Sequence, residues 1–236
     1  MDASNPFKGR HFEPSVILLC VRWYLSYALS YRDLQEMMAE RGLEVDASTV
    51  YRWVQAYAPE LERRVRRKLK PTAGNWHVDE TYVRVKGVWT YLYRAVDAAG
   101  QTIDFMLSRR RDTLAAKKFF EKALRSPHTE FPEALVVDRA SAYPKALILL
   151  KHEGYLGPEA HLVTGRWLNN RIEQDHRRIK RLVRPGLGFK AFPSASRTIQ
   201  GYEVMSMVRK GQVQGAARGD GKAISHLVEE LFGIAA

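Results

Sequence analysis

The sequence contains one cysteine, comparatively few acidic residues and no long apolar run, and each shortage excludes a class of protein. Cys20 alone cannot form an intramolecular disulfide or a cysteine-based zinc cage. Its place in the apolar string VILLCV predicts a buried thiol in a reducing cytoplasm. The longest apolar stretch, from Val16 to Leu29, is too short to cross a membrane and carries Arg22 near its centre. No signal segment is visible, so we expect a cytoplasmic protein without membrane association.

Basic residues outnumber acidic ones. The 236 residues include 38 Lys and Arg against 26 Asp and Glu, a formal net charge of +12. This excess favours a polyanionic partner, of which nucleic acid is the commonest, although many ribosomal and membrane-surface proteins share it. The length of 236 residues is room for one large domain or two small ones, and a hydrophobic content of 45% excludes wholesale disorder.

The residues from 14 to about 58 follow the period of α-helices. Ser30 and Asp33 resemble a capping box at the start of a second helix. Asp46 is expected to cap a third helix, and Pro59 is expected to end it. Two short helices joined by a tight Gly-containing connection, the second of them amphipathic, are typical of a helix-turn-helix module.

The outward face of the third helix is predicted to contact DNA. The polar side chains available there for phosphates and base edges are Ser48, Thr49, Tyr51, Arg52 and Gln55. The alternative is a generic three-helix bundle with a solvated polar face. The basic run LERRVRRKLK follows at residues 61–70, either as a solvated helix end or linker, or as a segment that tracks DNA phosphates.

From Trp76 onward the apolar period changes to two, which is typical of strands. Three strands are expected in an antiparallel meander whose connections contain Gly87 and Gly100. The elements expected next are a helix over 112–125, a strand over 134–138 buried on both faces, a helix over 143–152, a strand near 162–163 and a long helix over 167–183. The order βββαβαβα predicts a mixed α/β sheet flanked by helices.

Three carboxylates occupy positions suited to a metal site. Asp79 lies in the first predicted strand, Asp138 at the carboxyl end of the buried strand, and Glu173 on the last long helix. Oxygen ligands suit Mg²⁺ or Mn²⁺, and a pair of such ions promotes phosphodiester displacement. Each acid also has a plain structural alternative. Asp79 could pair with Arg84 or another base, Asp138 could cap the next turn, and Glu173 could lie on a solvated helix face.

Other acids are expected to lie outside this site. Glu80 follows Asp79 in a strand, so it should point to the opposite face of the sheet. Asp97 sits in a predicted hairpin turn. Asp175 lies about 200° around the helix from Glu173.

The last long helix presents a polar and an apolar stripe side by side. The polar stripe comprises Asn169, Glu173, Arg177 and Lys180. The apolar stripe comprises Leu168, Ile172, Ile179 and Leu182, so the helix is expected to dock on the sheet. Lys180, two turns beyond Glu173, is expected to grip a DNA phosphate near the scissile bond, with Asn169 and Arg177 as further DNA contacts. A solvated charged surface is the alternative.

The ordered acids and their flanking strings resemble one family of enzymes. Asp79, Asp138 and Glu173, with 34 residues between the last two, resemble the acidic triad of DDE transposases and retroviral-type integrases. Transposases of the insertion-sequence-six family, which are short bacterial enzymes, have strings similar to DETYVRVKGVWTYLYRAVDAAGQTIDF, WLNNRIEQDHRRIKR, FKGRHF, SYRDLQEMMAERG and STVYRWVQAYAPE. The resemblance runs from about Asn5 to about Lys210.

This resemblance implies an RNase H-like catalytic core and a metal-dependent transposase. The triad would bind two Mg²⁺ ions, with Mn²⁺ as a substitute. Activated water would hydrolyse the strand at a terminal inverted repeat, and the freed 3′-hydroxyl would attack target DNA in the same site. The implied partners are these double-stranded DNAs and further copies of the chain, in a homodimer or larger oligomer.

The expected organisation has four parts. They are a helix-turn-helix DNA-binding domain over 1–60, a basic linker over 61–75, an RNase H-like catalytic domain over 76–212 and a helical tail over 213–236. The tail carries no motif of the family.

Two other functions remain open from the residues alone. A helix-turn-helix regulator with an inert α/β domain would bind DNA without cutting it. A structure-specific nuclease with an RNase H-like core would cut without joining, although a sequence-reading module is of little use to it. A tyrosine recombinase would need a nucleophilic Tyr among Arg and His residues, and the sequence offers no convincing set of that kind.

Overall fold

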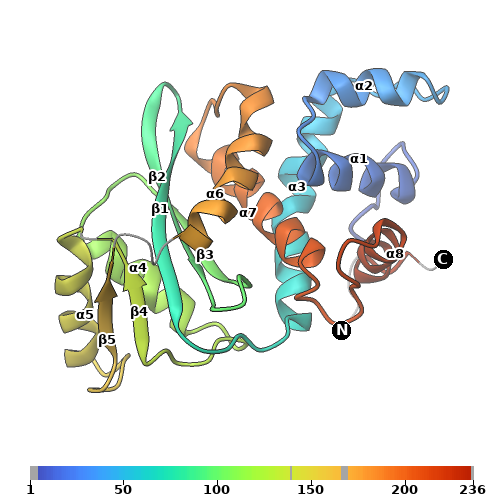
Figure 1. Ribbon diagram of the computed structural model, residues 1–236. Coiled ribbons are helices and arrows are strands. Elements are labelled where there is room, and N and C mark those ends of the chain that lie inside the picture. Colours follow the sequence, from blue (N-terminus) through green and yellow to red (C-terminus); the bar gives the residue numbers. More distant parts are fainter. Residues whose placement is uncertain (1–4, 139, 166–169, 235–236) are drawn as a thin grey trace. The chain divides into compact units, whose positions relative to one another are not determined.

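The computed structural model describes residues 5–138, 140–165 and 170–234 (Figure 1). The chain forms two compact units. The first unit comprises the residues up to Leu69, Arg184–Gly186 and the residues from Phe192 onward. The second unit comprises Lys70–Val183 and Leu187–Ala191. None of the helices in these described stretches combines the length and the apolar character needed to cross a bilayer.

The first unit is helical. Its elements are α1 (Pro14–Ser26), α2 (Tyr31–Ala39), α3 (Ala47–Val65), η1 (Arg66–Lys68), η2 (Arg184–Gly186), α7 (Phe192–Arg209) and α8 (Gly221–Leu231). The predicted capping box between Ser30 and Asp33 is confirmed at the start of α2. Asp46 caps α3 as predicted, because its carboxylate accepts a hydrogen bond from the Ser48 amide at 2.7 Å. Helices α2 and α3 are the predicted helix-turn-helix pair. Cys20 is buried as expected, and burial raises the pKa of its thiol to about 11.

The expectation that Pro59 ends the third helix is wrong. α3 continues through Pro59 to Val65, so most of the basic run over 61–70 is helical rather than an extended linker. Proline inside a helix removes one backbone hydrogen bond, at a cost of about 3 kcal/mol. Burial of Ala58 and Leu61 on either side of the proline stabilises the helix against that cost.

Residues 192–212 cluster with the N-terminal helices, although the sequence pattern assigns them to the catalytic domain. Gly201 of α7 explains part of this packing. A Cβ atom at Gly201 would lie 2.5 Å from the Leu25 side chain and 2.8 Å from Ala58 Cβ. The absence of a side chain therefore lets α7 approach α1 and α3 closely.

The second unit is the predicted mixed α/β structure. Its strands are β1 (Trp76–Val85), β2 (Val88–Val96), β3 (Thr102–Ser108), β4 (Ala134–Val137) and β5 (His161–Thr164). Its helices are α4 (Thr113–Leu124), α5 (Ala142–His152) and α6 (Asn170–Val183). The sheet has the order β3-β2-β1-β4-β5, with β1, β2 and β3 antiparallel and β4 and β5 parallel to β1. The predicted order βββαβαβα is confirmed.

Local chemistry explains the hairpin between β1 and β2. Lys86 and Gly87 both have positive φ, 53° and 79°, which is the requirement of a type I′ turn. This turn matches the twist of the flanking strands. The hairpin extends beyond the ends of β4 and β5 (Figure 1).

The sheet alternates between two environments. Val78 and Tyr93 point into the core cluster that includes Phe119 of α4 and Tyr143 of α5. The odd-numbered side chains of β1 face the other way, toward α6, and Asp79 contacts His176 of that helix. The predicted apolar stripe of α6 is confirmed at its described members, since Ile172, Ile179 and Leu182 are buried. Leu168 lies outside the described residues.

Candidate active site

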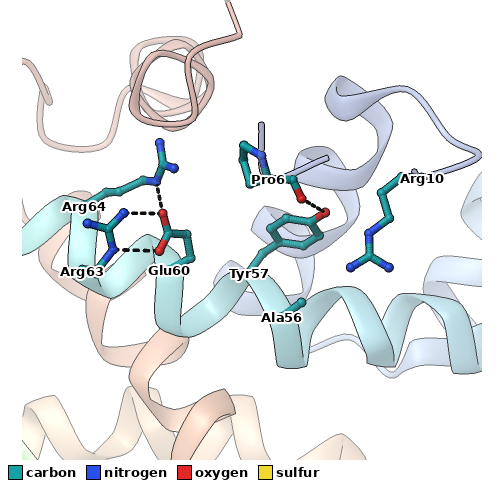
Figure 2. Close-up of a pocket in the computed structure, with 7 residues that line it drawn as sticks. All are labelled: Pro6, Arg10, Ala56, Tyr57, Glu60, Arg63 and Arg64. Carbon is teal, nitrogen blue, oxygen red and sulfur yellow. Dashed lines mark hydrogen bonds and ion pairs between the residues drawn. The ribbon is translucent and has the colours of Figure 1, made fainter. Parts of the chain in front are cut away.

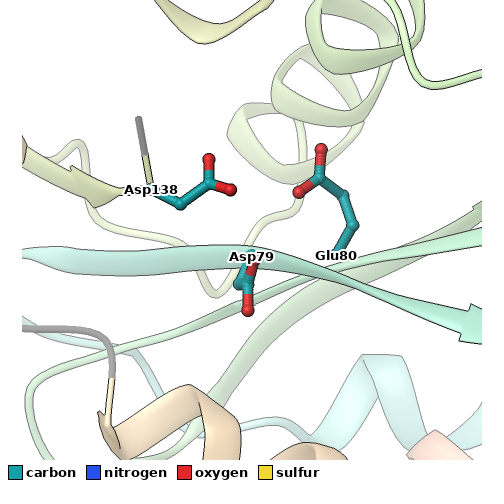
Figure 3. A group of neighbouring side chains, drawn as sticks. All are labelled: Asp79, Glu80 and Asp138. Atoms are coloured by element: carbon teal, nitrogen blue, oxygen red, sulfur yellow. The ribbon is translucent and has the colours of Figure 1, made fainter. Parts of the chain in front are cut away.

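The sheet brings two of the three predicted acids together. β1 and β4 are parallel neighbours in which His77 pairs with Val136. Asp79 and Asp138 each follow that pair by two residues, so they lie side by side. One carboxylate oxygen from each, with one from Glu80, lies within 4.8 Å of the others (Figure 3). Oxygen-only clusters of this size suit a divalent cation with Mg–O bonds of about 2.1 Å.

The exclusion of Glu80 from this cluster is wrong. Glu80 and Asp79 leave β1 on opposite sides, as predicted (Figure 3). The longer Glu80 side chain nevertheless carries its carboxylate to the neighbourhood of Asp138. Burial raises the pKa of Glu80, and the nearby Arg111 charge opposes that rise only in part.

Arg111 is the component that the sequence pattern missed. Its guanidinium donates to both Glu80 oxygens at 3.3 and 3.4 Å and to Asp138 at 3.1 Å. Arg111 precedes Asp112, the N-cap of α4, so the start of this helix positions it. The run of three arginines after β3 was the available signal. Arg111 therefore partly neutralises Asp138. Asp138 also accepts a hydrogen bond from the Ala140 amide at 3.0 Å, the turn-capping role considered above.

The opposite side of Asp79 faces a buried network on α6. His176 Nε2 lies 3.3 Å from Asp79, and His176 Nδ1 lies 3.3 Å from Arg94. Arg94 is fully buried, stands opposite Asp79 on β2 and donates to Asp175 at 2.5 Å. The partner of Asp79 is therefore His176 rather than Arg84. This network fixes α6 against the sheet.

Glu173 is exposed in the first turn of α6. It is not part of the group of described carboxylates that meet within 4.8 Å. Glu173 precedes His176 by three residues, which places both on the same side of the helix about one turn apart. The third predicted acid thus lies one turn from the residue that contacts Asp79.

Tyr143 lies close to the Glu80 carboxylate, but its environment opposes a role as a nucleophile. Burial, followed by the Glu80 charge, raises the pKa of its hydroxyl well above 10. A buried neutral phenol is a poor nucleophile. The environment of Tyr143 therefore gives no support to a tyrosine recombinase.

Comparison with known proteins identifies the family. Residues 73–212 match the family model described as DDE domain. The chain is 40% identical over 207 residues to the transposase for insertion sequence-like element IS431mec of Staphylococcus aureus, covering 87% of this chain and 89% of that protein. The same identity and coverage relate it to the transposase for insertion sequence element IS257 in transposon Tn4003 of Staphylococcus aureus. The chain belongs to the insertion-sequence-six family of DDE transposases.

The family membership implied by the flanking strings is therefore confirmed, and the structure confirms the predicted mixed α/β sheet flanked by helices. Among solved structures, the HTLV-2 integrase catalytic core domain in its dimeric form is similar over 64% of this chain and 95% of that chain, at 15% identity and a TM-score of 0.44. The catalytic core domain of BIV integrase is similar over 61% of this chain and 89% of that chain, at 16% identity and a TM-score of 0.43.

The predicted DNA-facing residues of this DDE transposase lie in different environments. On α3, Ser48, Tyr51 and Arg52 are exposed and Thr49 is half-buried. Arg52 donates to the Thr49 hydroxyl at 3.0 Å. Gln55 differs from the expectation of an outward contact, because it is half-buried and donates to Thr198 of α7 at 2.9 Å.

The predicted contacts on α6 are partly described. Arg177 and Lys180 are exposed, as a role in gripping DNA requires. Asn169 lies outside the described residues.

A second concave site lies in the first unit. It is a cavity of about 400 Å³ lined by Pro6, Arg10, Ala56, Tyr57, Glu60, Arg63 and Arg64 (Figure 2). Glu60 accepts hydrogen bonds from both Arg63 and Arg64. These bonds, chiefly the one from Arg63, lower the pKa of Glu60 to about 2. The two arginines are thus already paired within the cavity. It is a weaker candidate for an anion site than its arginine content suggests.

Proposed function

We propose that this DDE transposase cuts DNA at the terminal inverted repeats of its element and joins the freed 3′-hydroxyl to target DNA. The observation that carries the proposal is the meeting of Asp79 and Asp138 on adjacent parallel strands, in a chain of this family. Both strand cleavage and strand transfer are phosphoryl transfers, in which a protein acts mainly by positioning and electrostatics.

Asp79, Asp138 and Glu173 are the proposed metal ligands. Glu173 lies on α6 one turn before His176, which contacts Asp79, and this spacing supports Glu173 as the third ligand of a site centred on Asp79. When bound, two Mg²⁺ or Mn²⁺ ions supply the positive charge that activates an attacking oxygen and stabilises a leaving one.

Glu80 and Arg111 have a supporting role in this proposal. If Asp138 held a cation, Arg111 would give up its contact with Asp138, and the nearly inaccessible Glu80 carboxylate would keep Arg111 beside the site. The guanidinium then remains close to where DNA phosphate would lie. An arginine in such a position stabilises the additional negative charge of the phosphate in the transition state.

The first unit is proposed to read the transposon end through α3, within a DNA-binding domain over residues 1–60. Ser48 and Arg52 are exposed polar residues on the second helix of the helix-turn-helix pair, the element that enters the major groove in such modules. Holding two ends together requires at least a homodimer.

The proposal is tested by incubating the full chain with a labelled inverted-repeat end and target DNA, with Mg²⁺ and with a chelator. We expect nicked and joined products only with Mg²⁺. A helix-turn-helix regulator would bind without cutting, and a structure-specific nuclease would cut without joining. Either result would contradict the proposal.

Arg52→Ala should weaken binding to the transposon end, because Arg52 is exposed on the proposed recognition helix. We expect a loss of about 1–3 kcal/mol for the specific end if Arg52 contacts a base, and an equal loss on all sequences if it contacts phosphate. The measurement is equilibrium binding to specific and scrambled duplexes. Lys222→Ala on α8, an equal change in charge at an exposed site, is the control. Unchanged affinity of Arg52→Ala for both duplexes would remove this face of α3 from the interface.

Lys180→Ala should reduce strand transfer without changing metal affinity. An ammonium group has no lone pair to bind a metal ion, whereas it pairs readily with a DNA phosphate. A plot of log affinity against log salt concentration has a negative slope. We expect this slope to become shallower by about 0.9, which corresponds to the loss of one phosphate contact. Titration of Mn²⁺ binding to the protein should show an unchanged midpoint in Lys180→Ala, whereas Glu173→Gln should shift the midpoint. A metal midpoint that moves equally in both variants, with an unaltered salt slope, would contradict the role given to Lys180.

A further inference from the structure

The β1–β2 hairpin carries an exposed row of aromatic and cationic side chains beyond the acid cluster. This aromatic ladder consists of the exposed residues Tyr82, Arg84 and Trp89 and the half-buried Tyr91. Tyr82 is 49% exposed and Trp89 is 54% exposed. The strand register pairs Tyr82 with Tyr91 and Arg84 with Trp89. Large aromatic side chains left this open to solvent on one face are typical of a binding surface.

The rings of the ladder are in mutual contact. Tyr82 lies 5.4 Å from Tyr91 and 6.3 Å from Trp89, measured between ring centroids. The Arg84 guanidinium lies over the Trp89 ring at 5.2 Å. Residues 82–91 therefore hold a connected set of flat π surfaces with a cation among them. These contacts restrict the side chains before any ligand arrives, which reduces the entropy lost on binding.

The ladder continues the face of β1 that carries Glu80. Alternate residues of a strand share one face, so Glu80, Tyr82 and Arg84 follow one another at steps of about 6.8 Å. Opposite them on β2 stand Tyr93, Tyr91 and Trp89 in the same order. The first rings of the ladder thus lie one step from the carboxylates that meet at Asp138. The hairpin carries this face beyond the neighbouring parallel strands (Figure 1).

The charge of the hairpin identifies the kind of partner. The segment 81–96 contains no Asp or Glu, and exposed Arg84 and Lys86 flank the rings. A wholly apolar protein partner would leave these cations without counter-charge. Nucleic acid matches both features, because bases stack on aromatic rings and phosphates pair with the cations.

We propose that the aromatic ladder stacks unpaired bases of DNA next to the phosphate that is cut. The inference rests on the proposed function, since it takes the acid cluster as the place of cutting. Tyr82 and Trp89 provide the stacking surfaces, and Arg84 and Lys86 hold the adjoining backbone. Stacking separates the bases from their complement and keeps the strand extended toward Asp79 and Asp138.

The test compares two DNA probes that differ only in pairing. One is a fully paired duplex and the other carries unpaired nucleotides at one end, with 2-aminopurine among them. Binding to the full chain is measured without divalent metal, so that no cutting occurs. We expect the wild type to prefer the forked probe and to quench its fluorescence by stacking.

Variants of the ladder should remove this preference. Trp89→Ala should weaken binding to the forked probe by on the order of tenfold, while affinity for the paired probe changes little. Trp89→Phe keeps a stacking ring and should retain most of the preference, and Tyr82→Ala should reduce it independently. Val88→Ala is the matched control, since Val88 is 66% exposed on the same hairpin but pairs with Val85, on the other face. Thermal unfolding of each variant verifies that the fold is intact.

Three results for Trp89→Ala would overturn the proposal. The first is an equal loss of affinity for both probes, and the second is an unchanged affinity for both probes. The third is an altered oligomeric state with unchanged DNA binding, which would make the ladder a contact between copies of the chain. The proposed function is tested separately, by measuring Mg²⁺-dependent DNA cleavage by the wild-type protein. A preference for forked DNA without cutting would contradict the proposed function and leave the stacking surface intact, whereas cutting without the preference would overturn the stacking surface alone.

Discussion

Replacing Asp79 or Asp138 with Asn, or Glu173 with Gln, should abolish DNA cleavage and strand transfer while leaving binding to transposon ends largely intact. Each substitution keeps the size of the side chain and removes a negative charge that a divalent cation requires. Metal ions supply several kcal/mol of transition-state stabilisation, so we expect rate losses of roughly 10³-fold or more. The measurement is single-turnover cleavage of a labelled end, beside equilibrium binding to the same DNA and thermal unfolding of each variant.

Glu80→Gln is the discriminating control for this experiment. The structure brings the Glu80 carboxylate to Asp79 and Asp138, but Glu80 is committed to Arg111. A glutamine can still accept a hydrogen bond from that guanidinium. We therefore expect a much smaller loss of cleavage than in Glu173→Gln. The reverse order, with Glu80→Gln inactive and Glu173→Gln active, would make Glu80 the third ligand and remove Glu173 from the site.

Among the substitutions proposed here, Arg94→Met should cause the largest decrease in the free energy of unfolding. Arg94 has 0% exposure, its guanidinium donates to Asp175 at 2.5 Å, and it contacts His176 at 3.3 Å. Methionine fills much of the same volume but removes the cation from a mostly buried carboxylate. Breaking a buried ion pair in this way costs about 3–5 kcal/mol, which we expect as a decrease in the free energy of unfolding in urea.

The control for Arg94→Met is Arg177→Met. Arg177 is exposed on α6, the helix that carries Asp175 and His176, so its substitution should change the free energy of unfolding by no more than about 0.5 kcal/mol. An Arg94→Met variant as stable as this control would show that the buried network does not hold α6 on the sheet. A destabilised variant should also bind metal more weakly, because α6 carries Glu173.

Local patterns were enough to predict the sheet and part of the site. The two-residue period identified the meander, and the short apolar run ALVV identified a buried strand. These features follow from periodicity and from general rules of sheet topology. The sequence also predicted that Asp79 and Asp138 belong to one site, but the pairing of β1 with β4 that brings them together is a finding of the structure.

The remainder of the site depends on contacts between distant segments. Arg94 meets Asp175 and His176 across 81 and 82 residues of sequence, and no local pattern relates them. Arg111 reaches Glu80 across 31 residues, and the length of the Glu80 side chain overcomes the alternation that was used to exclude it. Tertiary contacts set all three relationships.

Tertiary packing also explains the errors in the helical unit. Pro59 is a local signal to end a helix, but burial of Tyr57, Ala58 and Leu61 in the same helix outweighs it. Gln55 has the composition of a DNA contact, yet Thr198 lies 143 residues later in the sequence and binds its amide. Helix propensity and polarity are therefore weak guides where a distant helix packs.

The central claim is that Asp79, Asp138 and Glu173 hold the catalytic metal. The most direct measurement is anomalous diffraction from crystals of the full chain soaked in Mn²⁺. We predict an anomalous peak within bonding distance of carboxylate oxygens from all three residues, with Arg111 turned away from Asp138, and loss of the peak in Asp138→Asn. A manganese ion bound by Glu80 in place of Glu173, or no ion at Asp79 and Asp138, would contradict the account.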